Sequence, residues 1–240
     1  MGRSDSGDDG PARAITLDRQ AVASGAMQSV LVAAQGLMRL ASEEEQAASL
    51  AAALAGWAPG RDAWLFAYGS LLWNPTIAFV ERRRARLDGY RRRYSLWVPV
   101  GRGTPEVPGL MLGLEAGGAC EGVAYRIAAE RVRDELALVW KREMLTGSYL
   151  ARWLPVQAPE GSLDALAFVV DVGHERYVSP DVDETVIVRH LAHAGGALGT
   201  CREYLERTVR ELGAEGLRDE YVERLWAAVT AYRERGGGEG

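Results

Sequence analysis

Segments with strand-like patterns gather in the middle of this chain, and segments with helix-like patterns lie at its two ends. Strands are predicted at 64–68, about 86–98, 109–115, 121–127, 152–157 and 164–172. Helices are predicted at about 16–55 (one or two), 129–145, 183–194, 200–213 and 217–234. Because strands and helices do not alternate regularly, we expect an α+β fold.

The 240 residues are enough for one large domain or two small ones. The Gly-, Asp- and Ser-rich segment 1–14 and the Gly-rich segment 235–240 are expected to be disordered tails. Residues 15–60 are rich in Ala, Leu and Glu and are expected to form a helical N-terminal extension. Residues 61–234 would then form the main domain.

Composition argues against several classes of protein. A net charge of -5 gives no general attraction for nucleic acid or for an anionic membrane. Cys120 and Cys201 lie far apart in the sequence, which argues against a disulfide scaffold or zinc ribbon and suits a reducing compartment. The N-terminus lacks the apolar core of a signal peptide, and no segment reaches the roughly 20 apolar residues of a bilayer span. We therefore expect a cytoplasmic protein that binds neither nucleic acid nor membrane.

The stretch WLFAYGSLLW, residues 64–73, places Gly69 and Ser70 inside an otherwise apolar run. Two explanations fit this interruption. The backbone there approaches a ligand, or the chain simply turns between two buried segments. Ser70 lacks the GxSxG pattern of a hydrolase nucleophile, so a Ser-His-Asp site is not expected.

The helix predicted at 129–145 carries a carboxylate on its apolar side. Its apolar face is formed by Val132, Leu136, Val139 and Trp140. Its solvated sides are expected to hold Arg133, Asp134, Lys141 and Arg142. Glu143 continues the apolar face near the end of the helix, where burial and the helix dipole would both raise the pKa of its carboxyl group. That suits a general base near neutral pH, and the alternative is a Glu at the helix edge that reaches water or pairs with an arginine.

Two further groups of residues have some features of functional sites. Seven arginines lie within 82–93, but the acidic total charge and the strand-like spacing of the apolar residues favour a solvated strand face over a nucleic-acid site. A local field that attracts a small anionic substrate is a second possibility. His190 and His193 lie three residues apart on a predicted helix, but no further ligands accompany them, so no metal is expected.

Six motifs follow one another between about Trp64 and Tyr232: FAYGSLLWNP, RRARLDGYRRRYSLW, GRGTPEVPGLMLGLE, CEGVAYRI, WKREMLTGSY and EYLERTV. Together they resemble the ChaC-type, glutathione-specific γ-glutamylcyclotransferases. The resemblance implies a small mixed β-barrel flanked by helices. It also implies cleavage of glutathione to 5-oxoproline and cysteinylglycine, without a metal or an organic cofactor.

The resemblance also implies site residues. The γ-glutamyl group would be held by the loop Ala67, Tyr68, Gly69, Ser70, Leu71 and Leu72. Glu143 matches the general acid/base of the family, and Tyr149 matches a position near the substrate. The family often has Asn at the position of Cys201, so a polar contact is expected to be lost there.

Alternative functions remain open at this point. The chain could be a cyclotransferase for other γ-glutamyl compounds, such as γ-glutamyl amino acids or amines. It could also be a non-catalytic protein that binds γ-glutamyl groups. Glu143 favours an enzyme, because a binding protein has no need of a desolvated base. A monomer is favoured.

Overall fold

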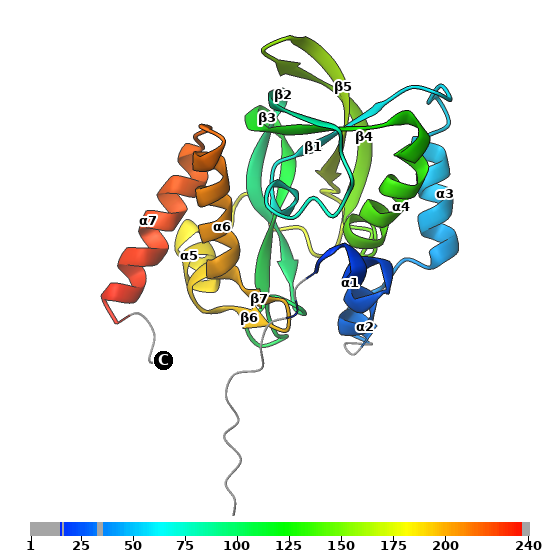
Figure 1. Cartoon of the computed structure of the whole chain (residues 1–240). Coiled ribbons are helices and arrows are strands. Elements are labelled where there is room, and N and C mark those ends of the chain that lie inside the picture. The colour runs from blue at the N-terminus through cyan, green and yellow to red at the C-terminus, as the bar shows by residue number, and fades with distance from the viewer. Residues whose placement is uncertain (1–14, 16, 33–35, 237–240) are drawn as a thin grey trace, which may run out of the picture.

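The computed structural model of the chain describes residues 15, 17–32 and 36–236. Its centre is a closed barrel with the strand order β1-β3-β2-β4-β5 (Figure 1). The strands are β1 (Ala63–Ala67), β2 (Glu81–Val98), β3 (Gly109–Ile127), β4 (Tyr149–Ala158) and β5 (Gly161–Val170). The pairs β1–β5 and β3–β5 are parallel, and the other pairs are antiparallel. This mixed barrel with helices around it confirms the predicted α+β class.

The helices lie in two groups around the barrel. They are α1 (Arg19–Ala23), α2 (Ala26–Val32), α3 (Glu43–Ala53), α4 (Val132–Glu143), α5 (Glu184–His193), α6 (Cys201–Ala214) and α7 (Glu220–Glu234). Single 3-10 turns, η1 (Ser70–Leu72) and η2 (Ala129–Arg131), precede longer elements, and β6 (Gly195–Gly196) pairs with β7 (Gly199–Thr200). In Figure 1, α5, α6 and α7 cover one side of the barrel, and α3 and α4 cover the opposite side.

The N-terminal region contains three helices within its described residues, where the sequence predicted one or two. The third begins with a capping box, since the Ser42 side chain accepts from the Glu45 N–H and the Glu45 side chain accepts from the Ser42 N–H. The predicted tails at 1–14 and 237–240 lie outside the described residues. In the part of the chain that the structure covers, no helix is long and apolar enough to cross a membrane.

The strands β2 and β3 form a long antiparallel ribbon, and here one expectation was wrong. The glycine-rich segment EAGGAC was predicted to separate two strands, but β3 runs through it without a break. Gly117 and Gly118 adopt φ angles of +101° and +74° and form a bulge opposite Gly89. Glycine reaches these angles without steric cost, so the strand bends there and keeps its pairing.

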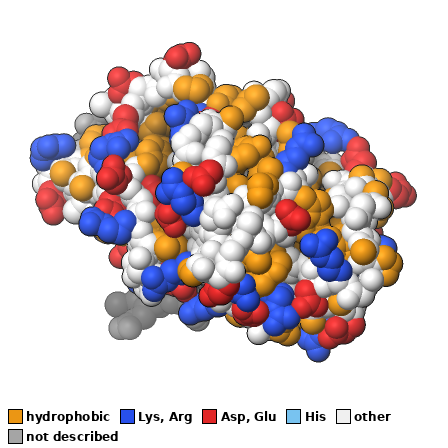
Figure 2. Space-filling model, turned by 90° about the horizontal axis from the view of Figure 1, so that it is seen from above, with side chains coloured by type: hydrophobic (Ala, Val, Ile, Leu, Met, Phe, Trp, Pro, Cys, Tyr) orange, Lys and Arg blue, Asp and Glu red, His pale blue; other side chains and the backbone are white. Residues whose placement is uncertain are grey.

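The arginines of β2 mostly lie on the solvated face, as predicted. Several pair with carboxylates, for example Arg86 with Glu121 and Arg93 with Glu115. Figure 2 shows basic and acidic side chains interspersed over the face of the molecule seen from above. Pairing of this kind neutralises the local charge that the sequence cluster suggests.

Arg92 is the exception on this strand, because only 3% of its surface is exposed. Its Nε donates to the Tyr68 carbonyl, 2.6 Å away, and its Nη1 pairs with Asp219 at the start of α7. A buried guanidinium therefore links β2, the segment after β1 and the C-terminal helices. These contacts of Arg92 hold the YGSL segment against β2 and the start of α7.

Candidate active site

The end of α4 carries a buried carboxylate. The apolar face predicted for this helix is buried, and Glu143 is its last residue, 9% exposed. Glu143 Oε1 lies 3.1 Å from Arg142 Nε but is not aligned for a hydrogen bond, and no other described residue bonds to this oxygen. Burial raises the pKa of the Glu143 carboxyl group, and the Arg142 charge opposes this in part. Glu143 therefore does not reach bulk water from the helix edge, but it does form an ion pair with an arginine, as one form of the alternative interpretation expected. Its role as a base stays a prediction.

Arg142 was expected on the solvated side of α4, and this expectation was wrong. The residue is 7% exposed. Its Nη2 donates to Ser70 Oγ and its Nη1 donates to the Asn74 carbonyl. These partners lie on η1 and just after it, and such charge-assisted hydrogen bonds offset the cost of burying the guanidinium. Helical periodicity could not reveal them, because they belong to another segment of the chain.

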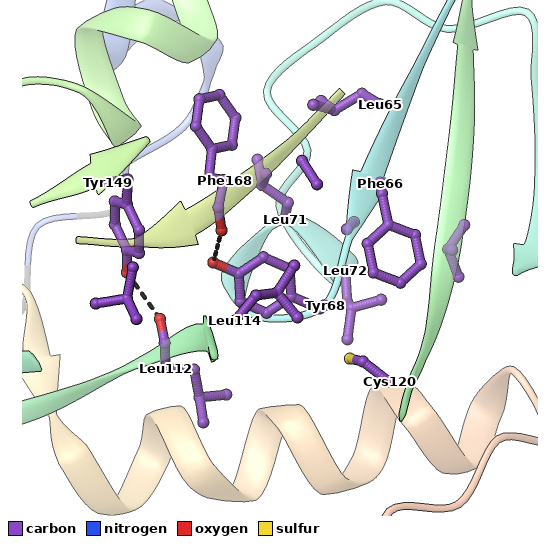
Figure 3. Packing of buried hydrophobic residues seen from close by; sticks show 14 of the residues in the cluster. Leu65, Phe66, Tyr68, Leu71, Leu72, Leu112, Leu114, Cys120, Tyr149 and Phe168 are labelled. Atoms are coloured by element: carbon purple, nitrogen blue, oxygen red, sulfur yellow. Dashed lines mark hydrogen bonds between the residues drawn. The ribbon is translucent and has the colours of Figure 1, made fainter. Parts of the chain in front are cut away.

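The YGSL segment leaves β1 and turns at once into η1. The Tyr68 hydroxyl donates to the Phe168 carbonyl, 2.7 Å away, which ties the segment to β5 (Figure 3). At Gly69, an added Cβ would lie only 2.9 Å from the hydroxyl oxygen of Tyr204 on α6. The glycine is thus needed for the close approach of Tyr204. The chain does turn here, and the turn borders a cavity.

That cavity has a volume of about 450 Å³, within the range of roughly 300–1,000 Å³ of small-molecule sites. Ser70, Glu143, Tyr149 and Tyr204 lie along its wall. A small recess adjoins it and shares these four residues. The Tyr149 hydroxyl donates to the Leu112 carbonyl, 2.7 Å away, which fixes the ring at the boundary of the two spaces (Figure 3).

The structure brings most of the predicted site residues together. Ser70, Glu143 and Tyr149 line the main cavity. The recess is lined by Tyr68, Gly69 and Leu71. Ala67 and Leu72 are buried and line neither space. The contacts of all these residues with a substrate stay predictions.

Sequence reasoning missed the arginines of the cavity. Its lining includes Arg102, Arg142, Arg176 and Arg207, together with the carboxylates of Glu143 and Glu203. Glu203 is already engaged, because it accepts from the Thr200 N–H in the capping box of α6. The excess of arginines makes the cavity positive and suits an anionic ligand. No single stretch of sequence could indicate this, since the four arginines come from separate loops and helices.

The N-terminal region supplies an apolar wall, a role that the sequence left open. The wall consists of Ile15, Leu17, Met27, Leu31 and Met38. The Ile15 N–H donates to the Ala197 carbonyl, 2.8 Å away, and the Leu17 carbonyl accepts from the side chain of Asn74. Arg19 anchors α1 to α4 through two hydrogen bonds to Glu135.

Two other predicted features have packing roles. His190 Nδ1 lies 2.7 Å from the Pro108 carbonyl, and its ring packs edge-on against Trp97. Within residues 15, 17–32 and 36–236, no three His, Cys, Asp or Glu side chains gather as a metal site would require. Cys201 Sγ accepts from the Leu110 N–H at 3.2 Å, and the expected loss of the contact that an Asn would make stays a prediction.

Comparison with known proteins agrees with this geometry. The family model described as ChaC-like protein matches residues 63–232. The chain is 42% identical over 189 residues to the glutathione-specific gamma-glutamylcyclotransferase of Escherichia coli (strain K12), which covers 78% of this chain and 81% of that protein. It is 32% identical over 173 residues to glutathione-specific gamma-glutamylcyclotransferase 1 of Homo sapiens, covering 69% of this chain and 78% of that protein.

The fold is also found among solved structures. The crystal structure of a selenomethionine-labelled γ-glutamyl cyclotransferase specific to glutathione, from yeast, matches with a TM-score of 0.66. The match covers 72% of this chain and 98% of the yeast chain at 20% sequence identity, so it concerns the fold alone. The family match spans the barrel, nearly all of the C-terminal helices and the cavity wall apart from its N-terminal part. The chain belongs to the ChaC-like protein family.

Proposed function

We propose that this chain is a γ-glutamylcyclotransferase that cleaves glutathione to 5-oxoproline and cysteinylglycine. The observation that carries the proposal is the Glu143 carboxylate, buried, with a raised pKa, and set in the wall of a positive cavity. A base of this kind suits proton transfer near neutral pH. The relatives named above act on glutathione, and this supports the choice of substrate.

The reaction needs no nucleophile from the protein. The α-nitrogen of the γ-glutamyl residue attacks its own γ-carbonyl carbon, so a new C–N bond closes the lactam and the bond to the cysteinyl nitrogen breaks. Two protons leave the α-nitrogen and two reach the cysteinyl nitrogen, which departs as an ammonium group. Glu143 would accept the first proton and later return one to the leaving nitrogen. The protein supplies the folded conformation of the substrate, the proton path and stabilisation of the oxyanion.

The segment 67–72 is proposed to hold the γ-glutamyl head. Backbone N–H groups around Gly69 and Ser70 would bind its α-carboxylate or the developing oxyanion. Arg142 would keep this segment in a constant position relative to Glu143, because it bonds Ser70 and lies beside the carboxylate. Tyr149, at the boundary of cavity and recess, would contact the substrate next to the reacting carbonyl.

The proposal keeps two expectations that come from the sequence. Reaction in the cytoplasm is supported by the two cysteines, which are free and buried in the structure. Action as a monomer is kept as an expectation that comes from the sequence.

One assay tests the function. The protein is incubated with glutathione, γ-glutamylalanine and a γ-glutamylamine, and 5-oxoproline is measured. We expect glutathione to be the preferred substrate. Glu143→Gln keeps the shape of the side chain and removes the base, so turnover should fall about 10²-fold or more. Asp134→Asn, an exposed change of the same kind on the same helix, is the matched control and should leave turnover unchanged.

The outcomes separate the alternatives. Absence of 5-oxoproline with every substrate would refute the enzyme and favour a non-catalytic protein that binds γ-glutamyl groups. Preference for γ-glutamylalanine or the amine would make the chain a cyclotransferase for other γ-glutamyl compounds. Full activity of Glu143→Gln would refute the proposed role of this residue.

A further inference from the structure

Arg176 is a buried arginine of the cavity to which the proposed reaction assigns no role. It lies in the segment between β5 and α5, is 9% exposed and forms part of the cavity wall. Its backbone is held firmly, since its carbonyl accepts from the Trp97 N–H at 2.8 Å and its N–H donates to His174 Nδ1 at 3.2 Å. The side chain is therefore placed at a defined point of the wall.

One edge of the Arg176 guanidinium has no partner. Nη1 reaches the Trp97 carbonyl at 3.5 Å, but Nε and Nη2 are buried without a hydrogen bond to any residue that the structure describes. A buried cation in this state is costly, and burial accordingly lowers the pKa of Arg176. Nε and Nη2 carry two parallel N–H bonds, the edge that binds both oxygens of a carboxylate.

The carboxylates of the cavity wall do not fill this position. Glu203 accepts from the Thr200 N–H at the start of α6, and Glu143 lies beside Arg142. No ion pair joins either of them to Arg176 among the described residues. Neither carboxylate is therefore the partner of this edge of Arg176.

Arg176 lies at a different part of the cavity from the proposed base. Burial is the main cause that raises the pKa of Tyr149, the Glu143 carboxylate adds to this effect, and the Arg176 charge opposes it. For Glu143 itself, the opposing positive charge is Arg142. Glu143 and Tyr149 line both the recess and the main cavity, whereas Arg176 lines the main cavity alone and so lies outside the recess.

We propose that Arg176 binds the glycyl carboxylate of glutathione and so selects the whole tripeptide. This inference rests on the proposed function, which places the γ-glutamyl end at Ser70 and Glu143. The glycyl carboxylate is at the opposite end of the substrate, two residues from the scissile bond. A γ-glutamyl dipeptide or amine has no carboxylate at that distance. Arg176 is therefore a specificity residue, and it takes no part in proton transfer.

The test compares glutathione with its glycyl ethyl ester, which lacks only this negative charge. For the wild-type protein we expect kcat/KM to be about 10-fold or more lower with the ester, mainly through KM, because charge-assisted bidentate contacts are strong. Arg176→Gln should lower kcat/KM for glutathione to the level of the ester and leave the value for the ester unchanged. Arg176→Lys should recover part of the preference, since it keeps the charge but not the paired N–H bonds.

Arg207→Gln is the matched control, because it removes a positive charge from the exposed rim of the same cavity. It should reduce the preference for glutathione over the ester much less than Arg176→Gln. An equal reduction by both variants would mean that general charge attraction suffices, and this would overturn the inference. An equal loss on both substrates in Arg176→Gln would assign the residue to the α-carboxylate or to structure instead.

Two measurements keep the inference separate from the reaction. If Arg176→Gln does not fold, the wild-type protein alone decides, because equal turnover of ester and glutathione would overturn the inference. Binding of both compounds to Glu143→Gln by calorimetry needs no turnover. Absence of 5-oxoproline with selective binding of glutathione would refute the reaction and still support the role of Arg176.

Discussion

Arg142 near the end of α4 donates from Nη2 to the Oγ of Ser70 in the YGSL segment, and this bond joins the two halves of the candidate site. Its Nε also lies 3.1 Å from Glu143 Oε1. One buried guanidinium thus fixes the distance between the segment proposed to bind the substrate and the residue proposed to act on it.

The Arg142–Ser70 bond is expected to make the two residues act as a unit. Ser70→Ala removes one acceptor and should lower kcat/KM by about 10-fold, whereas Arg142→Met releases the whole segment and should lower it by about 100-fold. The double variant should be no worse than Arg142→Met alone, because the shared contact is already lost. The measurement is a double-mutant cycle on kcat/KM, and simple additivity would show that the bond is not functional.

Activity should fall on the acidic side at a pH above the ordinary Glu pKa. Burial raises the pKa of Glu143 from 4.5 and the Arg142 charge opposes this, so the basic form is lost as the pH drops through the raised value. The hydroxyls near it, Tyr68, Tyr149 and Tyr204, have raised pKa values and stay neutral. The check is the pH profile of kcat. In Arg142→Met the acidic limb should move to higher pH, and an unmoved limb would assign it to another group.

Glu143→Gln should make the protein more stable at neutral pH. A carboxyl group whose pKa is raised by folding binds protons more tightly in the folded state, so the stability of the wild-type protein falls as the pH rises from the unfolded-state pKa through the raised folded-state pKa. The amide of Glu143→Gln does not ionise, so the variant does not lose stability in this pH range. Thermal unfolding should show a higher Tm for the variant. Each kcal/mol gained in the free energy of unfolding should raise Tm by about 2–4 °C in a domain of this size. Below about pH 4 the difference should vanish, since both side chains are then neutral.

A methyl group at position 69 should conflict with Tyr204. Gly69→Ala places a Cβ 2.9 Å from the Tyr204 hydroxyl oxygen, so the variant should lose roughly 1–3 kcal/mol of stability. Tyr204→Phe removes that oxygen, and Gly69→Ala should then be tolerated in its background. Chemical denaturation of the four proteins measures this directly. If Gly69→Ala is equally costly with and without the hydroxyl, the glycine is required for some other reason.

Release of the N-terminal helices should weaken substrate binding more than catalysis. Glu135 is 2% exposed and receives two hydrogen bonds from Arg19, so Arg19→Met leaves a buried carboxylate without its cation. We expect KM to rise several-fold with little change in kcat, because Glu143 and Ser70 are not disturbed. Limited proteolysis should cut faster within residues 17–32. Arg39→Met, which removes an exposed ion pair with Glu45, is the matched control.

The apolar spacing of α4 was sufficient to place Glu143 on the buried side of its helix. Gly69 and Ser70 marked an interruption of the apolar run, and the structure shows both a turn and the border of a cavity there. Such signals are local, because helical and strand periodicity report which side of an element meets the core. The α+β class followed from the same kind of signal. The bulge at Gly117 and Gly118 could not be predicted from the sequence. Glycine can either end a strand or bend it, and only the pairing with β2 decides between the two.

The positions of the charged partners were decided by tertiary structure alone. The spacing of Arg142 predicted a solvated side chain, and its burial depends on Ser70 and Asn74, about 70 positions earlier in the sequence. Arg176 and Tyr149 line the same cavity only because distant segments of the chain pack together. A sequence pattern shows which charges a helix or strand carries, but the energy of a buried charge depends on the groups that other segments bring beside it. The chain thus encodes its candidate base locally, and the arginine-rich cavity around it arises only when the distant segments pack together.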